Sequence, residues 1–390
     1  MTPRVVASNL SVTFSNPMPN DLLYFLILAS IEGLGCRGAH RLLDFFQTPS
    51  AIFAASMRDL IQQGVSEPVA QSLLSGRKRT QAEAELAKCQ QNHIQILTFH
   101  DDAYPQILKQ IFDPPILLFV KGDLTCLNMP SIAIVGSRRA TPYGINAAEK
   151  LARELAQRTL TICSGLARGI DSAAHRGALE VQGKTVAVLG SGLDHIYPRE
   201  NRKMAQQIES SGCVVSEFPM GTSPTPQNFP IRNRIISGLS LGVCLVEAAE
   251  FSGSLITARL ALEQGREVLA VPGNITSKNS FGPNLWIKQG AKLVQNWQDI
   301  VEELPRPIKE QVLSCSETSS HPSEPSLFSE VLTAAEKCVL ELLRDDEASH
   351  VDQLLEQSRL TSSELLSTLS ELEMKDKIKQ LPGKNFVRKV

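Results

Sequence analysis

The feature that most constrains this chain is a series of nine short apolar runs between residues 94 and 304. Most runs are continuous rather than alternating, as expected for strands buried on both faces of a parallel sheet. Helical patterns separate them, and strand–helix repetition of this length predicts an α/β fold with a doubly wound, mostly parallel sheet. The expected strands are 94–99, 116–120, 132–136, 161–164, 185–190, 214–218, 243–248, 268–272 and 292–294. The expected helices are 145–158, 170–181, 202–210, 232–237 and 255–263.

Smaller segments flank this central domain, which we place at 91–304. Residues 1–20 are interpreted as a flexible tail, and Asn20-Asp21 as the cap of a first helix. Segment 21–90 predicts a small helical domain, SAM-like or helix-hairpin-helix-like, broken at Gly33-Leu34-Gly35. The amides of such a turn can face a DNA phosphate, but seven basic and seven acidic residues in 21–90 favour a plain helical bundle. Residues 305–330, rich in Pro, Ser and Glu, predict a linker.

The last segment, 331–390, has the pattern of a winged helix: three short helices and a hairpin around Pro382-Gly383. Its expected recognition helix, 361–373, carries three glutamates and no lysine or arginine. A helix that enters a major groove needs positive charge, so protein contact is the first interpretation. The wing carries four lysines that can make weaker DNA contacts: Lys375, Lys377, Lys379 and Lys384.

Small residues follow several of the expected strands. These loops are 136–144, 164–171, 190–194 and 252–254, and segment 229–234 follows a longer connection. In a parallel sheet such loops present backbone amides and helix N-termini at one edge, an arrangement that favours anions. Window 131–240 holds 13 Lys+Arg and 8 Asp+Glu, a difference of +5, whereas the whole chain is −2. A local excess of cations predicts a polyanion partner.

Common catalytic and cofactor signatures are missing. His195 occupies the place of the third glycine in a dinucleotide fingerprint beginning at Gly190, and no P-loop or Gly-x-Ser-x-Gly motif occurs. The eight cysteines form no CxxC pair, so we expect neither zinc nor thiol redox chemistry and infer a reducing, cytoplasmic location. The longest apolar stretch near the N-terminus, 22–31, is too short to span a bilayer. We expect no catalytic residues, metal or cofactor.

Four residues have a structural interpretation that competes with a functional one. Phe229 precedes two arginines, so it either stacks a base or anchors its loop under the sheet edge. Asp171 and His175 lie four apart on one helical face, where capping or packing is favoured over metal or acid–base work. Lys184 precedes a strand, at the edge of the sheet where the strands begin, and is interpreted as a solvent-exposed lysine in a turn.

Motifs from about Tyr104-Pro105 to Val294 resemble the DNA-processing protein A family (DprA, also called Smf). They include segments 134–138, 164–171, 187–194, 229–240, 246–248, 252–258, 271–273 and 282–284. The resemblance implies an extended Rossmann fold and a single-stranded DNA-binding protein of natural transformation and competence. It implies protection of incoming strands, loading of the RecA recombinase, a homodimer through the central domain, and no established catalysis.

The resemblance also implies a DNA pocket. Its residues would be Gly136, Ser137, Arg138, Gly165, Arg168, Gly169, Lys184, Phe229, Arg232, Asn233 and Arg234. Arg139 departs from the family pattern by doubling the first arginine, and we add it to the expected DNA-binding residues. Two rivals remain open. One is a nucleoside monophosphate phosphoribohydrolase that uses Glu247 near Ser252-Gly253-Ser254. The other is a transcriptional regulator that binds duplex DNA through the winged helix.

Overall fold

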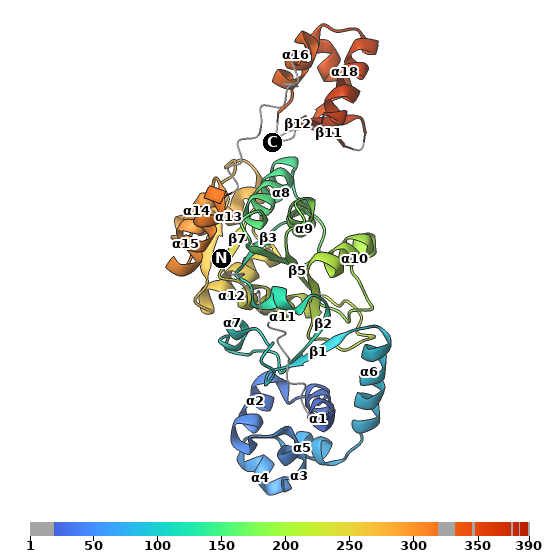
Figure 1. The fold of residues 1–390 in the computed structure, drawn as a ribbon, viewed down its shortest axis with the longest axis vertical. Coiled ribbons are helices and arrows are strands. Elements are labelled where there is room, and N and C mark those ends of the chain that lie inside the picture. Colours follow the sequence, from blue (N-terminus) through green and yellow to red (C-terminus); the bar gives the residue numbers. More distant parts are fainter. Residues whose placement is uncertain (1–18, 319–331, 345–347, 376, 382, 389–390) are drawn as a thin grey trace, which may run out of the picture. The chain divides into compact units, whose positions relative to one another are not determined.

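The computed structural model describes residues 19–318, 332–344, 348–375, 377–381 and 383–388 (Figure 1). It divides into two compact units. The first contains the described residues up to Lys109 together with Asp113–Phe119, and the second contains Gln110–Phe112 and the chain from Val120 onward. The predicted tail lies outside the described residues, except that the first helix already begins at Pro19 and so includes the expected cap.

The first unit is built mainly from short helices. They are α1 (Pro19–Ala29), α2 (Gly35–Phe46), α3 (Pro49–Ala54), α4 (Met57–Gln62), α5 (Glu67–Leu74), α6 (Arg79–Gln91) and α7 (Gln106–Lys109). The glycine break between α1 and α2 is present: Gly33 and Gly35 adopt φ values of +82° and +63°, which favour glycine. The sequence did not predict α6, because this polar helix buries only Ala82, Glu85 and Cys89 and shows no apolar stripe.

All nine predicted strands are present. They are β1 (Gln95–Thr98), β2 (Leu117–Gly122), β3 (Ser131–Val135), β4 (Thr161–Ser164), β5 (Thr185–Val188), β6 (Cys213–Ser216), β7 (Gly242–Leu245), β8 (Glu267–Ala270) and β9 (Lys292–Leu293). Their order in the sheet is β1-β2-β6-β5-β4-β3-β7-β8-β9. Strand β3 pairs in parallel with β4 on one side and β7 on the other. The chain reverses its direction of winding there, so the topological switch point lies between β3 and β7.

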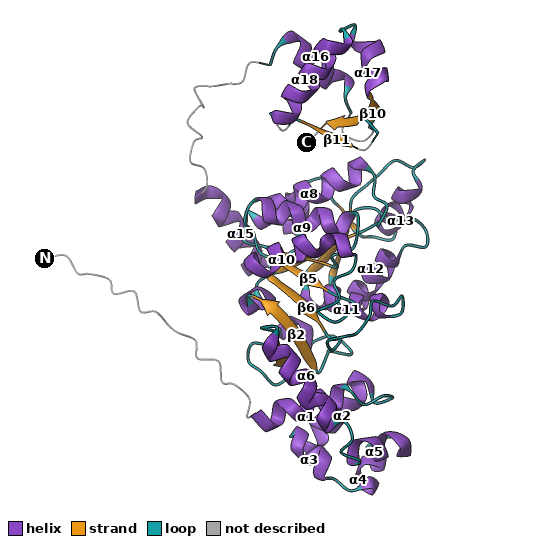
Figure 2. Ribbon diagram, turned by 90° about the vertical axis from the view of Figure 1, so that its right-hand side faces the viewer, coloured by secondary structure: helices purple, strands orange, loops and turns teal. Residues whose placement is uncertain are grey.

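Helices cover both faces of this sheet (Figure 2). They are α8 (Pro142–Ala156), α9 (Ile170–Glu180), α10 (Arg202–Ser211), α11 (Asn228–Leu239), α12 (Gly253–Glu263), α13 (Phe281–Lys288) and α14 (Trp297–Glu302). Ile162 of β4 packs in one core with α8 and α9. Its neighbour Cys163 faces the other way, with Sγ 3.9 Å from the carbonyl oxygen of Ile236 in α11. Alternation along the strand therefore buries both faces.

The prediction of a linker from 305 is wrong for its first part, because Arg306–Thr318 form helix α15. Ile308 and Val312 lie four residues apart and pack against the central core, and Val312 is 1% exposed. Burial of this stripe stabilises a helix that the Pro-, Ser- and Glu-rich composition did not indicate. The rest of the predicted linker, 319–331, lies outside the described residues.

The C-terminal module has the winged-helix elements. They are α16 (Ala334–Leu342), β10 (Ser349–His350), α17 (Val351–Ser358), α18 (Ser362–Met374), β11 (Ile378–Leu381) and β12 (Asn385–Arg388). Thr333 and Thr361 each form a capping box, with Glu336 and Glu364 respectively. The wing pairs antiparallel, Ile378 opposite Arg388. Lys375 donates to the buried Glu336 at 2.6 Å and thus serves the packing of this module.

Candidate nucleic-acid interface

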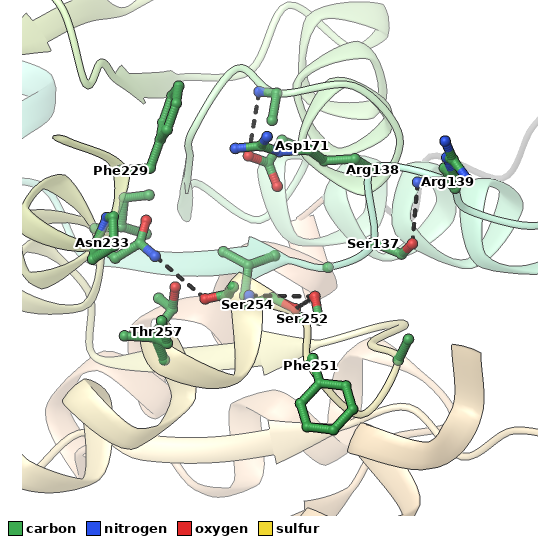
Figure 3. A pocket seen from close by; sticks show the side chains of 18 of the residues that line it. Ser137, Arg138, Arg139, Asp171, Phe229, Asn233, Phe251, Ser252, Ser254 and Thr257 are labelled. Atoms are coloured by element: carbon green, nitrogen blue, oxygen red, sulfur yellow. Dashed lines mark hydrogen bonds between the residues drawn. The ribbon is translucent and has the colours of Figure 1, made fainter. Parts of the chain in front are cut away.

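A cleft of about 1080 Å³ opens at the carboxyl ends of the central strands (Figure 3). Loops from separate elements line it: the β3–α8 loop with Gly136, the β4–α9 loop with Ala167, and the start of α11 with Phe229. The β7–α12 loop around Ser252 and the short helix η3 (Lys278–Ser280) complete the wall. The cleft therefore lies at the switch point, where ligands of open α/β sheets bind.

Arg138 and Arg139 are exposed on the β3–α8 loop, and both line the cleft. The loop is held tightly. Thr141 caps α8 by accepting from Gly144 N at 3.2 Å, and Ser137 Oγ accepts from Arg139 N at 3.1 Å. A side chain at Gly136 would place its Cβ 2.6 Å from Ile170 and 2.8 Å from the Glu247 carbonyl oxygen, so only glycine fits. The sheet thus presents two guanidinium groups on a fixed turn.

Phe229 is partly buried and lies beside two cations. The Arg138 guanidinium carbon is 4.8 Å from its ring centroid, and that of Arg232 is 5.9 Å away. The ring of Tyr197 lies 6.0 Å from it, tilted by 45°. The ring therefore lines the cleft beside Arg138, and base stacking on it stays a prediction. A base that stacks on Phe229 would meet Arg138 at its phosphate.

Arg232 differs from Arg138 because it is only 4% exposed. Its Nη1 donates to the Val188 carbonyl oxygen, and its Nε has no hydrogen-bond partner among the described residues. Burial lowers its pKa to about 10, so it stays charged at neutral pH. Burial likewise raises the pKa of Asp171, and the charge of Arg232 opposes that shift. Arg232 thus sets a buried positive charge beneath the cleft.

Gly165 and Gly169 matter because the absence of a side chain leaves room for neighbouring groups. A Cβ at Gly165 would lie 2.6 Å from Cζ and Nη2 of Arg232, so Gly165 makes room for that guanidinium. Gly169 has φ +74°, and a Cβ there would collide with the Ser137 carbonyl oxygen and lie 3.0 Å from the Arg138 carbonyl carbon. Neither glycine lines the cleft, but each lets the adjacent loops pack.

Three predicted cations are held elsewhere. Arg168 forms a bidentate ion pair with Glu200, with Nη2 2.8 Å from Oε2, while both side chains stay exposed. Arg234 is 6% exposed and paired with Glu217. Lys184 precedes β5, at the amino edge of the sheet, and donates to Asp123 at 2.9 Å. The structure therefore brings together Gly136, Ser137, Arg138, Arg139, Phe229, Arg232 and Asn233 at the cleft, and does not place Gly165, Arg168, Gly169, Lys184 or Arg234 there.

Sequence reasoning missed several residues of the cleft. Among them are Tyr197, Phe251, Thr257, Lys278 and Asn279. Phe251 directly precedes the Ser252-Gly253-Ser254 loop, so an aromatic residue beside a strand-end loop is the sequence signal for it. Lys278 and Asn279 lie eight and nine residues beyond the end of β8, too far from it for a pattern at the strand end to indicate them.

Glu247 is held by hydrogen bonds within the protein and is not among the residues that line the cleft. It is 3% exposed and accepts from Thr141 N at 2.9 Å, from Thr141 Oγ1 at 2.5 Å and from Asn279 Nδ2 at 3.3 Å. These bonds place Glu247 as an anchor of the β3–α8 loop, which argues against the phosphoribohydrolase hypothesis. Among the residues that the structure describes, no cluster of three or more His, Cys, Asp or Glu is suited to a metal ion. None of the described helices is both long and apolar enough to cross a bilayer.

Together, the fold and the cleft define a class: a Rossmann-like α/β protein with a cationic cleft at its switch point and a separate winged helix. Comparison with known families narrows the class. The family model of the DNA recombination-mediator protein A matches residues 95–305, and that of the DprA winged helix domain matches 321–384. The chain belongs to the DNA recombination-mediator protein A family, so the resemblance seen in the sequence is confirmed.

Relatives cover most of the chain. Protein Smf of Escherichia coli is 38% identical over 372 residues, which is 94% of this chain and 96% of the relative. The DNA processing protein DprA of Bacillus subtilis is 46% identical over 221 residues, 56% of this chain and 74% of the relative. The crystal structure of DprA from Streptococcus pneumoniae aligns with a TM-score of 0.66 at 37% identity, covering 74% of this chain and 99% of that one.

Proposed function

We propose that this protein binds single-stranded DNA without sequence preference in natural transformation, where it protects incoming strands and loads RecA onto them. We further propose that it acts as a homodimer through the central domain, in the cytoplasm, and by binding rather than by catalysis. Membership of a recombination-mediator family supports this proposal, as do relatives named DNA processing proteins.

The observation that carries the proposal is the exposed Arg138 beside the Phe229 ring, with Arg139, also exposed, lining the same cleft. Guanidinium groups neutralise phosphates whatever the sequence, and an aromatic ring stacks any base, because every base has a π-face. Unstacked, flexible backbone can bend into such a cleft, whereas a stacked duplex cannot offer its base faces. The cleft therefore favours single strands.

A titration of fluorescent oligo(dT) by anisotropy tests the binding. Arg138→Ala should weaken it and reduce the slope of log K against log salt by up to about 0.7, the share of one phosphate contact on a single strand. Arg306→Ala is the matched control, because Arg306 is exposed and pairs only along its own helix, with Glu310. Normal affinity and an unchanged slope in Arg138→Ala would refute the assignment of this cleft.

RecA loading has its own assay. We expect the protein to shorten the lag before RecA hydrolyses ATP on single-stranded DNA, and Arg138→Ala to lose this effect in step with its DNA affinity. Sedimentation of the full chain should give twice its mass of 42.6 kDa. A monomer at all concentrations would contradict the dimer, without bearing on the cleft.

A further inference from the structure

Phe251 is the most exposed large apolar side chain among the described residues, at 94%. It lies between β7 and α12 and lines the cleft. Figure 3 shows it on a different wall from Phe229, with Ser252 and Ser254 between the two in that view. A solvent-exposed aromatic ring at the mouth of a cationic cleft is a surface that a ligand can bury on binding.

The loop that carries Phe251 is joined to the cationic loops by Asn279. The Asn279 side-chain amide donates to the Arg139 carbonyl oxygen at 2.9 Å and to Glu247 at 3.3 Å. Its own carbonyl oxygen accepts from Ala248 N at 2.7 Å. Asn279 therefore ties together the β3–α8 loop, the start of the β7–α12 loop and the η3 segment, where Lys278 is exposed on the cleft.

We propose that Phe251 is a second base-stacking platform, and that Arg139 and Lys278 hold the phosphates of the strand that reaches it. The inference rests on the proposed binding of single-stranded DNA and extends it: the strand runs from the Arg138–Phe229 wall across the cleft. Glu250 is exposed next to Phe251 and repels phosphate, so the ring receives the base while the backbone passes on the side of Arg139 and Lys278.

The experiment separates the two kinds of contact: loss of a base contact lowers the affinity alone, whereas loss of a phosphate contact also lowers the slope of log K against log salt. Phe251→Ala should bind oligo(dT) about fivefold or more weakly, the loss expected from one stacked base, with an unchanged salt slope. Lys278→Ala should instead reduce that slope by up to about 0.7. On a deoxyribose-phosphate chain of equal length without bases, Phe251→Ala and the wild type should bind equally. Phe251→Trp should retain the affinity for oligo(dT).

Ile275→Ala is the matched control, because Ile275 is 92% exposed but does not line the cleft. It should bind like the wild type. Three results would each overturn the proposal: wild-type affinity of Phe251→Ala for oligo(dT), an equal loss on the base-free chain, or a change of oligomeric state with DNA affinity per protomer preserved. The last would assign the ring to contact between copies. Failure of the proposed function is separate, since then the wild type itself would not bind oligo(dT).

Discussion

Replacing Gly165 with alanine should destabilise the second unit, because the new methyl group would collide with the Arg232 guanidinium. The new Cβ would lie 2.6 Å from Cζ and Nη2 and closer still to Nη1 of that residue, whereas ordinary contacts begin near 3.4 Å. A guanidinium on a flexible side chain can usually move away. This one is only 4% exposed and donates to the Val188 carbonyl oxygen, so moving it breaks a buried charged hydrogen bond.

Loss of such a bond costs about 1.5–3 kcal/mol, and overpacking adds to it, so we expect about 3 kcal/mol for Gly165→Ala. Urea unfolding followed by tryptophan fluorescence measures this, because Trp286 and Trp297 are the only two tryptophans and both belong to the second unit. Gly253→Ala is the control: nothing lies within 4 Å of its Cβ, so its effect should stay within about 1 kcal/mol.

A double-mutant cycle isolates the contact between the two residues. In an Arg232→Met background the guanidinium is gone, so Gly165→Ala should cost less than about 1 kcal/mol there. If the alanine costs the same in both backgrounds, the clash with Arg232 is not its cause and the reasoning fails.

Three further substitutions test other parts of the structure. Lys184→Ala should leave the affinity for oligo(dT) unchanged within about twofold, because Lys184 pairs with Asp123 at the edge of the sheet away from the cleft. A tenfold loss of affinity, measured by anisotropy, would contradict this placement. Arg234→Ala removes the cation that faces Glu217 in a buried pair, so the free energy of unfolding in urea should fall by about 3–5 kcal/mol, and an unchanged midpoint would argue against the pair. Burial lowers the pKa of His175 to about 3 in the folded protein, against about 6.5 when unfolded. The contribution of the neutral imidazole to the free energy of unfolding is therefore fully present above pH 6.5, and about 2 kcal/mol of it is lost by pH 5. His175→Gln should lose less between pH 7 and 5 in the same assay, and an identical loss would show that other groups cause it.

The architecture could be predicted because its signals are local. Continuous apolar runs and their spacing specify a buried parallel sheet, and β4 occupies the predicted residues, 161–164. Thr333 and Thr361 likewise mark helix starts through capping boxes that depend on residues three positions away. Helix α15 could not be predicted, because its stability depends on a core that Val312 reaches only after the chain has folded.

The site was predictable only in part, because sequence shows where charges are and not what faces them. The position of Arg138 follows from the switch point, since it is the third residue after the end of β3. The partners of Arg168 and Arg234 are Glu200 and Glu217, 32 and 17 residues away, and no local pattern indicates these pairs. Counting arginines at strand ends therefore overestimates the number of arginines that line the cleft.

Competition between single and double strands tests the proposed cleft most directly. Labelled oligo(dT) bound to the full chain would be displaced by unlabelled single strands of mixed sequence and by a duplex of equal length, at several salt concentrations. We predict that the single strands compete alike, that the duplex competes at least about tenfold less well, and that affinity falls linearly with log salt. A duplex that competes as well as single strands would contradict a cleft built for one unpaired strand.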